Sequence, residues 1–267
     1  MFPKHCSVLV LSALVSAGGL IPSAASAYVT PKMGGGQTSA PMKHADVFFD
    51  GTNVSVHLDE TVATPVLRPL TPPDQFDPAQ PWSVLGYRAY NYQYAGNPGA
   101  PFTLPPGGAI WVERVYQDPA LEVFLRPPQW VYSPEHPYWT PLFQTDGARW
   151  KWGNSMQHNA YTVCGPWQST YTATYTVYIG DVDTGAPLDG YGSASVTFTW
   201  NAGLVGDMND DGVVDGVDIA PFVLALLDRT GYETAYPGCR WYDADCNCDG
   251  LVNEADVQAL INALIGP

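Results

Sequence analysis

The chain has 267 residues, of which 26 are acidic and 11 are basic, so its formal net charge is −15. A chain this acidic is a poor partner for nucleic acid, because phosphate binding depends on clustered Lys and Arg side chains. Hydrophobic residues make up 46% of the chain, which is enough to build a full core.

The first 27 residues have the pattern of a signal peptide. Residues 6–21 are almost wholly apolar or small, and Ala25-Ser26-Ala27 follows as an A-x-A cleavage signal. The apolar run is short and interrupted by glycine, which does not favour a permanent membrane span. We expect cleavage after Ala27 and a mature protein that is secreted or held at the cell surface, with no transmembrane segment.

Strands are expected through the body of the chain. Residues 28–43 are small, polar and glycine-rich, and predict a flexible leader. From residue 44 to residue 202, short runs alternate apolar and polar side chains, as half-buried strands do. The expected strands are residues 46–49, 54–58, 109–116, 121–126, 171–179 and 193–200. Many prolines and the lack of a helical period favour an antiparallel β-sandwich, which we end at Asn201-Ala202-Gly203.

Two acidic loops follow within residues 203–267. Residues 207–218 read DMNDDGVVDGVD, and residues 245–256 read DCNCDGLVNEAD. Both loops carry acidic or amide side chains at positions 1, 3, 5, 9 and 12, and glycine at position 6. Oxygen ligands at this spacing, with a glycine for the sharp turn, suit calcium. The predicted ligands, with Val213 and Leu251 acting through their carbonyls, are Asp207, Asn209, Asp211, Val213, Asp215, Asp218, Asp245, Asn247, Asp249, Leu251, Asn253 and Asp256.

The charge of this region predicts that its folding depends on the metal. Residues 203–267 hold twelve acidic and two basic side chains, a net charge of −10. Two calcium ions would cancel four of these charges, whereas metal-free loops repel themselves.

An apolar stripe with helical spacing follows each loop, so each unit reads as a loop plus one helix. The stripes are Ile219, Phe222, Val223, Leu226 and Leu227 in the first unit, and Val257, Leu260, Ile261, Leu264 and Ile265 in the second. Neither helix can hide its apolar face alone, so we expect the two stripes to bury each other.

This duplicated loop with one following helix resembles the type I dockerin, a calcium-dependent module that docks onto a cohesin. The resemblance covers about residues 205–267. It implies a cohesin-like or other extracellular protein partner, contacted beside loop positions 10 and 11, which are Gly216 and Val217 in one repeat and Glu254 and Ala255 in the other. Dockerins of cellulose-degrading assemblies carry Ser-Thr at these positions, so this chain departs from the residues that recognise that class of cohesin.

Four cysteines remain after cleavage: Cys164, Cys239, Cys246 and Cys248. Export makes disulfides plausible, and three pairings are possible. A bond between Cys246 and Cys248 would be strained. We favour a bridge from Cys239 to Cys246 or Cys248, which would staple the segment between the loops to the second loop.

The strand region allows two other functions. Its tryptophans, Trp130, Trp139, Trp150 and Trp152 among them, would bind carbohydrate if exposed on one face, or fill the core if buried. A glycoside hydrolase would need two carboxylates across a cleft. The candidates for such a pair are Glu113, Asp118, Glu122, Glu135 and Asp146. None lies in a motif, so we predict a non-catalytic protein.

Three further motifs give the strand region a looser resemblance. They are His44-Ala45-Asp46, the LPPGG of residues 104–108, and Gln157-His158. On these the region resembles secreted bacterial surface-protein β-sandwich domains of unknown function, which implies display or attachment without known chemistry. His44, Asp46 and His158 would meet in space only as surface or structural residues.

Overall fold

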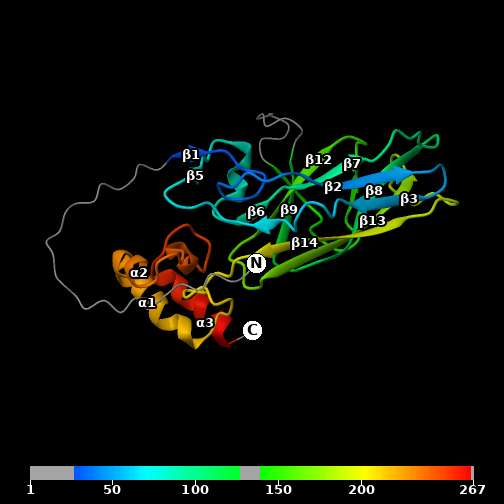
Figure 1. Ribbon diagram of the computed structural model, residues 1–267. Coiled ribbons are helices and arrows are strands. Elements are labelled where there is room, and N and C mark those ends of the chain that lie inside the picture. Colours follow the sequence, from blue (N-terminus) through cyan, green and yellow to red (C-terminus); the bar gives the residue numbers. More distant parts are fainter. Residues whose placement is uncertain (1–26, 127–138, 266–267) are drawn as a thin grey trace.

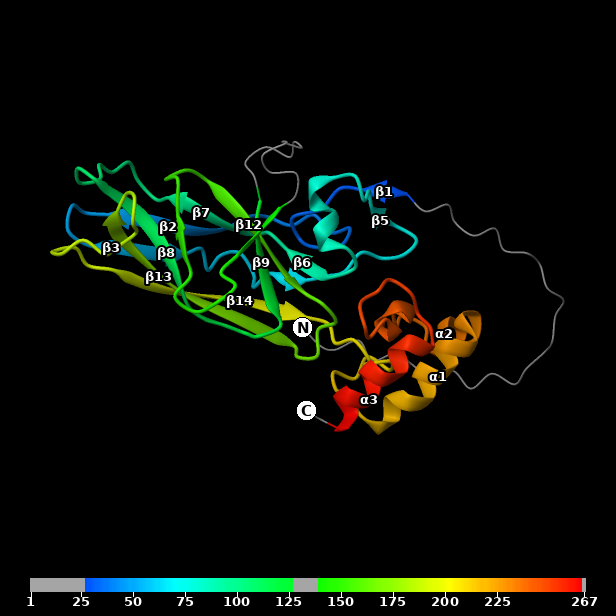
Figure 2. The ribbon, with the colours of Figure 1, turned by 180° about the vertical axis from the view of Figure 1, so that it is seen from behind.

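The computed structural model describes residues 27–126 and 139–265. It is mainly β, with a sandwich-like body followed by a small helical region at its C-terminal end (Figures 1 and 2). The predicted signal peptide lies, except for Ala27, outside the described residues. Among the described residues, no helix has the length and apolar character needed to cross a bilayer.

The larger sheet has seven strands. The order is β10-β9-β12-β7-β2-β3, and β6 pairs with the second half of β12. The strands are β2 (Lys43–Phe49), β3 (Val54–Leu58), β6 (Ala89–Asn91), β7 (Tyr94–Pro98), β9 (Leu121–Leu125), β10 (Thr140–Leu142) and β12 (Gln157–Val163).

The second sheet has five strands, in the order β11-β8-β13-β14-β4. They are β4 (Val66–Leu67), β8 (Gly108–Gln117), β11 (Arg149–Lys151), β13 (Thr170–Asp181) and β14 (Ala194–Ala202). A short pair, β1 (Tyr28–Val29) and β5 (Gln75–Phe76), and a 3₁₀ turn at Pro81–Leu85 complete the body.

The sheets are mixed, so the prediction of a purely antiparallel sandwich is wrong. β2 pairs with β7, β14 with β4, and β1 with β5, all in parallel. Strand β7 reaches β2 through a long connection that contains β3 to β6, and such a connection can return the chain in the same direction. Alternation in the sequence fixes which face of a strand is buried, but it does not fix the direction of its neighbour.

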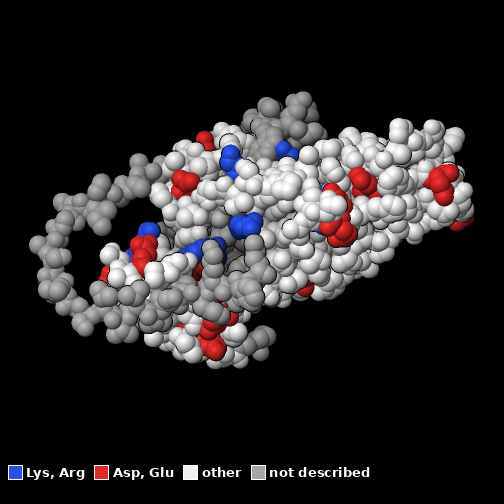
Figure 3. Space-filling view, in the orientation of Figure 1, with Lys and Arg blue, Asp and Glu red and all other residues white. Residues whose placement is uncertain are grey.

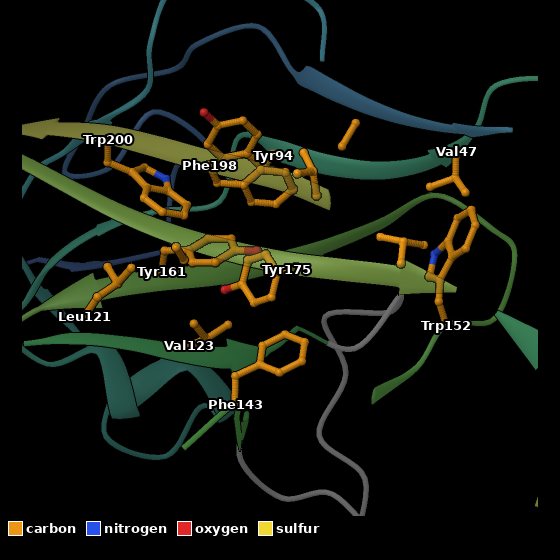
Figure 4. Close-up of a cluster of buried hydrophobic side chains, with 14 of the residues drawn as sticks. Val47, Tyr94, Leu121, Val123, Phe143, Trp152, Tyr161, Tyr175, Phe198 and Trp200 are labelled. Carbon is orange, nitrogen blue, oxygen red and sulfur yellow. The ribbon is translucent and has the colours of Figure 1, made fainter. Parts of the chain in front are cut away.

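An aromatic core lies between the sheets (Figure 4). Tyr94 of β7 stacks on Phe198 of β14 with ring centroids 4.2 Å apart, and Tyr161 of β12 lies 4.3 Å from Trp200. The predicted alternation in residues 171–179 is confirmed, because Tyr171, Ala173, Tyr175, Val177 and Ile179 are all buried. The aromatic residues of this region therefore serve mainly to fill the core.

The segment predicted as a flexible leader, residues 28–43, is instead packed on the body. Besides pairing β1 with β5, it wraps around two buried tyrosines: Lys32 N donates to Tyr90 Oη at 2.8 Å, and Tyr92 Oη donates to the Pro31 carbonyl at 2.9 Å. The glycine-rich composition of this segment suggested flexibility, but its glycines have a structural role. Gly35 and Gly36 take left-handed backbone angles in a tight turn against residue 68.

The helical region contains three helices. Helix α1 (Ile219–Leu227) and helix α3 (Val257–Ile265) follow the two acidic loops, and each is preceded by a single 3₁₀ turn, Gly216–Asp218 and Glu254–Asp256. A short third helix, α2 (Arg229–Ala235), and a 3₁₀ turn at Trp241–Ala244 lie between the repeats and were not predicted. Helices α1 and α3 lie side by side in both views (Figures 1 and 2).

Only two of the five members of each apolar stripe pack in the helical core, which corrects the expectation that the stripes bury each other. Phe222 and Leu260 are in the helical core, together with Met208, Tyr232 and Cys246. The outer members of the stripes are exposed: Ile219, Val223 and Leu227 on α1, and Val257, Ile261 and Ile265 on α3. The helices therefore keep an apolar outer face.

Candidate metal-binding loops of the helical region

The first loop is closed by its two end carboxylates. Asp207, at position 1, accepts hydrogen bonds from Asp211 N at 3.1 Å and Gly212 N at 2.8 Å. Asp218, at position 12, accepts from Met208 N at 2.7 Å and Asp215 N at 2.9 Å. Both ends of the loop are thus tied to its middle, and the two carboxylates face each other closely enough for Asp207 to raise the pKa of Asp218.

The second loop repeats most of this arrangement, except that Asp256 accepts from the N–H of position 3 rather than position 2, since Cys246 N donates to the Ala244 carbonyl. Asp245 accepts from Asp249 N at 3.0 Å and Gly250 N at 2.9 Å. Asp256 accepts from Asn247 N at 3.1 Å and Asn253 N at 2.9 Å. The repeat recognised in the sequence is therefore also a repeat in hydrogen bonding.

The middle positions are equally alike. Asn209 donates to the carboxylate of Asp211 at 2.9 Å, and Asn247 donates to that of Asp249 at 3.0 Å. At position 9 the side chain caps the following helical turn: Asp215 accepts from Val217 N, and Asn253 accepts from Ala255 N, both at 2.7 Å. Val213 and Leu251 are exposed, as expected of residues that contribute a backbone carbonyl rather than a side chain.

The glycines at position 6 serve the purpose that the sequence predicted. Gly212 has φ +89° and Gly250 has φ +85°, in the left-handed region that residues with a Cβ adopt only at a cost. Position 4 is also left-handed, with φ +56° at Asp210 and +63° at Cys248. Two left-handed residues in three turn the chain sharply, so that the oxygens of positions 1 to 5 face inward.

Three of the four end carboxylates are buried. Asp218 and Asp256 are fully buried and Asp207 is nearly so. Burial raises the pKa of all four end carboxyls, that of Asp245 to about 6. No ion pair formed by these four side chains is found in the described part of the chain.

Buried carboxylates of this kind are suited to binding a divalent cation. Buried charges in proteins are normally paired or bound to a metal. The donor set of carboxylate, amide and carbonyl oxygens is the one that calcium prefers. Within the described ranges, no three His, Cys, Asp or Glu side chains converge as in a preformed centre, since the loop oxygens are hydrogen-bonded to backbone N–H groups. The loop oxygens are therefore candidate ligands, and closing the loops around an ion would require these bonds to rearrange.

The predicted bridge from Cys239 to the second loop is not present. Cys246 and Cys248 both carry free thiols. Cys246 points into the helical core, as Met208 does at the same position of the first loop, whereas Cys248 faces the sandwich.

The sandwich covers the second loop, a contact for which the sequence carries no signal. The ring of Tyr87 lies over Gly250, and the sulfur of Cys164 lies 3.7 Å from the carbonyl oxygen of Asn247. Val205 N donates to the Pro166 carbonyl at 2.9 Å, which ties the linker to the end of the sandwich. The two parts of the chain are thus joined along one surface.

The charged surface agrees with this division. On the face drawn in Figure 3, the sandwich is largely uncharged, with scattered acidic groups, whereas acidic side chains gather on the small helical region. The concentration of negative charge in residues 203–267, expected from the sequence, is therefore a property of one part of the molecule.

The tryptophans considered for carbohydrate binding do not form an exposed face. Trp139 and Trp152 are buried, and Trp150 packs against the core beside Phe143. Trp130 lies outside the described residues. A carbohydrate site on this set would require the rings to be at the surface, so the described members give it no support.

The carboxylates considered for glycoside hydrolysis have structural partners. Glu113 pairs with Arg149, Glu122 with Arg88 and Asp146 with Arg114, at N–O distances of 2.6, 2.8 and 2.7 Å. Asp118 accepts a hydrogen bond from Tyr116 Oη at 2.8 Å in the turn before β9. Glu135 lies outside the described residues. The four described carboxylates thus have roles in turns and surface ion pairs.

The histidine group is likewise structural. His44 on β2 and His158 on β12 both align with Ala95, with strand β7 between them. Burial lowers the pKa of His158, whose Nδ1 lies 2.9 Å from the Tyr92 carbonyl, and Asp46 accepts from Asn97 at 2.9 Å. Asp46 and His158 therefore bond to groups of the sheet itself, whereas the buried Nε2 of His44 has no hydrogen-bond partner among the described residues.

Comparison with known proteins adds no assignment to this geometry. No protein-family model matches the chain, and no curated protein and no solved structure is significantly similar to it.

Proposed function

We propose that residues 203–267 form a dockerin-like module that binds two calcium ions and attaches an exported, non-catalytic protein to a second extracellular protein. The observation that carries the proposal is the pair of loops with closely similar hydrogen bonding, in which the carboxylates at positions 1 and 12 accept from backbone N–H groups and three of the four are buried. Folding such loops without a cation costs free energy, because buried carboxylates lose their hydration and repel one another. A bound cation offsets this cost.

In this proposal the twelve predicted ligand residues hold the two ions. Calcium would neutralise the end carboxylates and cancel four units of the net −10 carried by the region. The proposal is supported by the burial of the carboxyls at positions 1 and 12, which raises their pKa values. In this proposal calcium has a structural role, which is to stabilise the fold of the helical region, and it takes no part in a reaction.

The outer face of the helices supports a role in docking. Gly216, Val217, Glu254 and Ala255 are all exposed, as the resemblance to dockerins requires of a contact surface. Most of the large exposed apolar side chains in the described residues belong to this region, which is about a quarter of the chain. They are Val213, Val217, Ile219, Val223, Leu227, Leu251, Val257, Ile261 and Ile265. A small acidic module with an exposed apolar face is what a protein partner would cover.

The sandwich then acts as the part that is attached. Its aromatic side chains are used in packing, and the expected signal peptide would export it to the cell surface or the medium. N-terminal sequencing of the exported protein tests that step, with Tyr28 as the expected first residue. A mature chain that still begins at Met1 would rule out cleavage at Ala27.

Calcium binding can be tested on the full chain with matched loop variants. Titration calorimetry should detect two calcium sites, and chelation should remove the helical part of the circular dichroism spectrum. Asp207→Asn should remove one site, and Asp245→Asn the other. Asp210→Asn removes the same charge from the first loop at a position that is not a ligand, and it should retain both sites. No heat of calcium binding in the parent, or equal losses in Asp207→Asn and Asp210→Asn, would refute the proposal.

Attachment can be tested by capture from the native secretome with and without calcium. A partner retained by the full chain only with calcium, and released by chelation, supports docking. Capture that is unaffected by chelation would place the interaction outside the loops.

A further inference from the structure

Two cysteines from distant parts of the chain meet where the sandwich covers the second loop. Cys164 directly follows strand β12, and Cys248 is the fourth residue of the loop. Their thiols are hydrogen-bonded to each other, and Cys164 also contacts the Asn247 carbonyl at 3.7 Å. Both are free thiols in the structure.

The repeat shows that Cys248 is not required by the loop itself. Its counterpart in the first loop is Asp210, and both residues have positive φ, +63° and +56°. Aspartate adopts this backbone conformation more readily than most residues, so Asp210 suits the loop, whereas cysteine has no such advantage. The feature that distinguishes position 4 of the second loop is the sulfur of Cys164 opposite it.

Neighbouring contacts keep the two thiols together. A Cβ atom on Gly165 would lie 3.1 Å from the carbonyl oxygen of Cys246, so the backbones run close together beside the thiols. Thr71 and Tyr242 share a hydrogen bond of 3.1 Å across the same surface. A cavity of about 60 Å³ borders Cys248 and Tyr87, which leaves room for the Cys248 side chain to rotate.

We propose that Cys164 and Cys248 form a disulfide bond that fastens the sandwich to the second loop. The oxidant is a small-molecule or protein disulfide, which exported proteins commonly encounter. One cysteine thiolate attacks this disulfide, releases one thiol and leaves a mixed disulfide on the protein. The second thiolate then displaces the other thiol. The protein loses two S–H bonds and gains one S–S bond, and the incoming disulfide is reduced to two thiols.

The bond requires only a small movement. The sulfurs, already in hydrogen-bonding contact, must approach to about 2.0 Å. Cys246 is a poor competitor, because it is buried in the helical core with its sulfur 3.8 Å from the Asp243 carbonyl. The contact between the two thiols does not require a protein partner to be bound. This inference and the proposed role in attachment can therefore fail separately.

The test uses the reduced, folded full chain with calcium present. After treatment with oxidised glutathione and alkylation of the remaining thiols, mass spectrometry of the digest should find the peptide of Cys164 linked to that of Cys248. The link should disappear on reduction. Cys246→Ala should leave it intact, whereas Cys248→Asp, which copies the residue of the first loop, should abolish it and leave Cys164 as a glutathione adduct.

A second measurement keeps the test decisive if one variant folds poorly. The oxidised parent should melt at a higher temperature than the reduced parent, and the difference should vanish in Cys164→Ser. A folded parent in which both thiols are alkylated after oxidation, or in which Cys246 is the linked residue, would overturn the proposal.

Discussion

The ring of Tyr87 in the sandwich lies directly over Gly250, the sixth residue of the second acidic loop. A Cβ atom on Gly250 would overlap three ring atoms of Tyr87. Gly212, the equivalent residue of the first loop, has the same left-handed φ but no atom within 4 Å of such a Cβ. The two loops, alike in sequence and hydrogen bonding, therefore differ in their surroundings: the sandwich covers the second loop at its glycine, whereas the first loop is open there.

This difference predicts unequal effects of the same substitution. Gly212→Ala places a Cβ at positive φ and should cost about 1–2 kcal/mol of stability. Gly250→Ala has this cost and also forces Tyr87 aside, which should add about 1–3 kcal/mol. Chemical unfolding of the calcium-loaded protein measures both. Tyr87→Ala combined with Gly250→Ala should lose less than the sum of the two single changes, because the overlap is then removed.

Equal losses from Gly212→Ala and Gly250→Ala would contradict the contact between the sandwich and the second loop. Strict additivity of the Tyr87 and Gly250 changes would contradict it as well.

The sequence predicted what local patterns determine and missed what depends on long-range packing. The strands over residues 54–58 and 171–179 followed from alternation, and the two acidic loops from their spacing. The strands β4 and β6 have too few residues to show a period, and β7, with the sequence YAGNP, does not alternate apolar and polar side chains. Tyr87 and Cys164 carry no motif, and only the fold brings them to the second loop. The cysteine spacing favoured a bridge from Cys239 to Cys246 or Cys248, but both of these loop cysteines are free thiols.

Packing of the segment after the signal peptide predicts a stability cost in a variant of Tyr90. The Tyr90 hydroxyl is buried, accepts from Lys32 N and donates to the Gly36 carbonyl, both at 2.8 Å. Tyr90→Phe should cost about 1–3 kcal/mol, because both backbone groups lose their partner in a buried place. The loss should also make residues 28–42 easier to cut with a protease.

Tyr116→Phe is the matched control for that change, since the Tyr116 ring is 46% exposed and its hydroxyl bonds only at the surface. If Tyr90→Phe is no more destabilising than Tyr116→Phe, and residues 28–42 are cut as readily in the parent, the segment is the flexible leader that its composition suggested.

The buried carboxyls predict an unusual dependence on pH in the metal-free protein. Burial raises the pKa of Asp245 from 3.8 to about 6. A carboxyl with a higher pKa in the folded chain binds more protons when folded, so its ionisation opposes folding above about pH 6. That opposition fades as the pH falls from about 6 toward 4. In chelator, helical circular dichroism should therefore increase when the pH is lowered from about 7.5 to about 5.5.

Calcium should reverse this behaviour, because protons compete with the ion for the same oxygens and affinity should fall over the same pH range. Asp245→Asn should reduce the response in chelator, and Asp210→Asn should leave it nearly unchanged. A metal-free protein that steadily loses helical signal as the pH falls from 7.5 would show that other carboxylates control its stability.

The exposed outer face of the helices predicts where a partner binds. Val217 is 63% exposed at position 11 of the first loop, and Ala255 is exposed at the same position of the second. Val217→Asp and Ala255→Asp each add a charge to the apolar face without touching a ligand side chain. Each single variant should weaken the captured partner's affinity, and the double variant should abolish binding while both calcium ions remain bound. The two single effects should differ, because Val217 adjoins a glycine and Ala255 adjoins Glu254.

Val115→Asp adds the same charge to an exposed valine of strand β8 and should leave binding unchanged. If the double variant folds with calcium and binds as tightly as Val115→Asp, the docking surface is elsewhere, and the loops serve only to hold the helical region together.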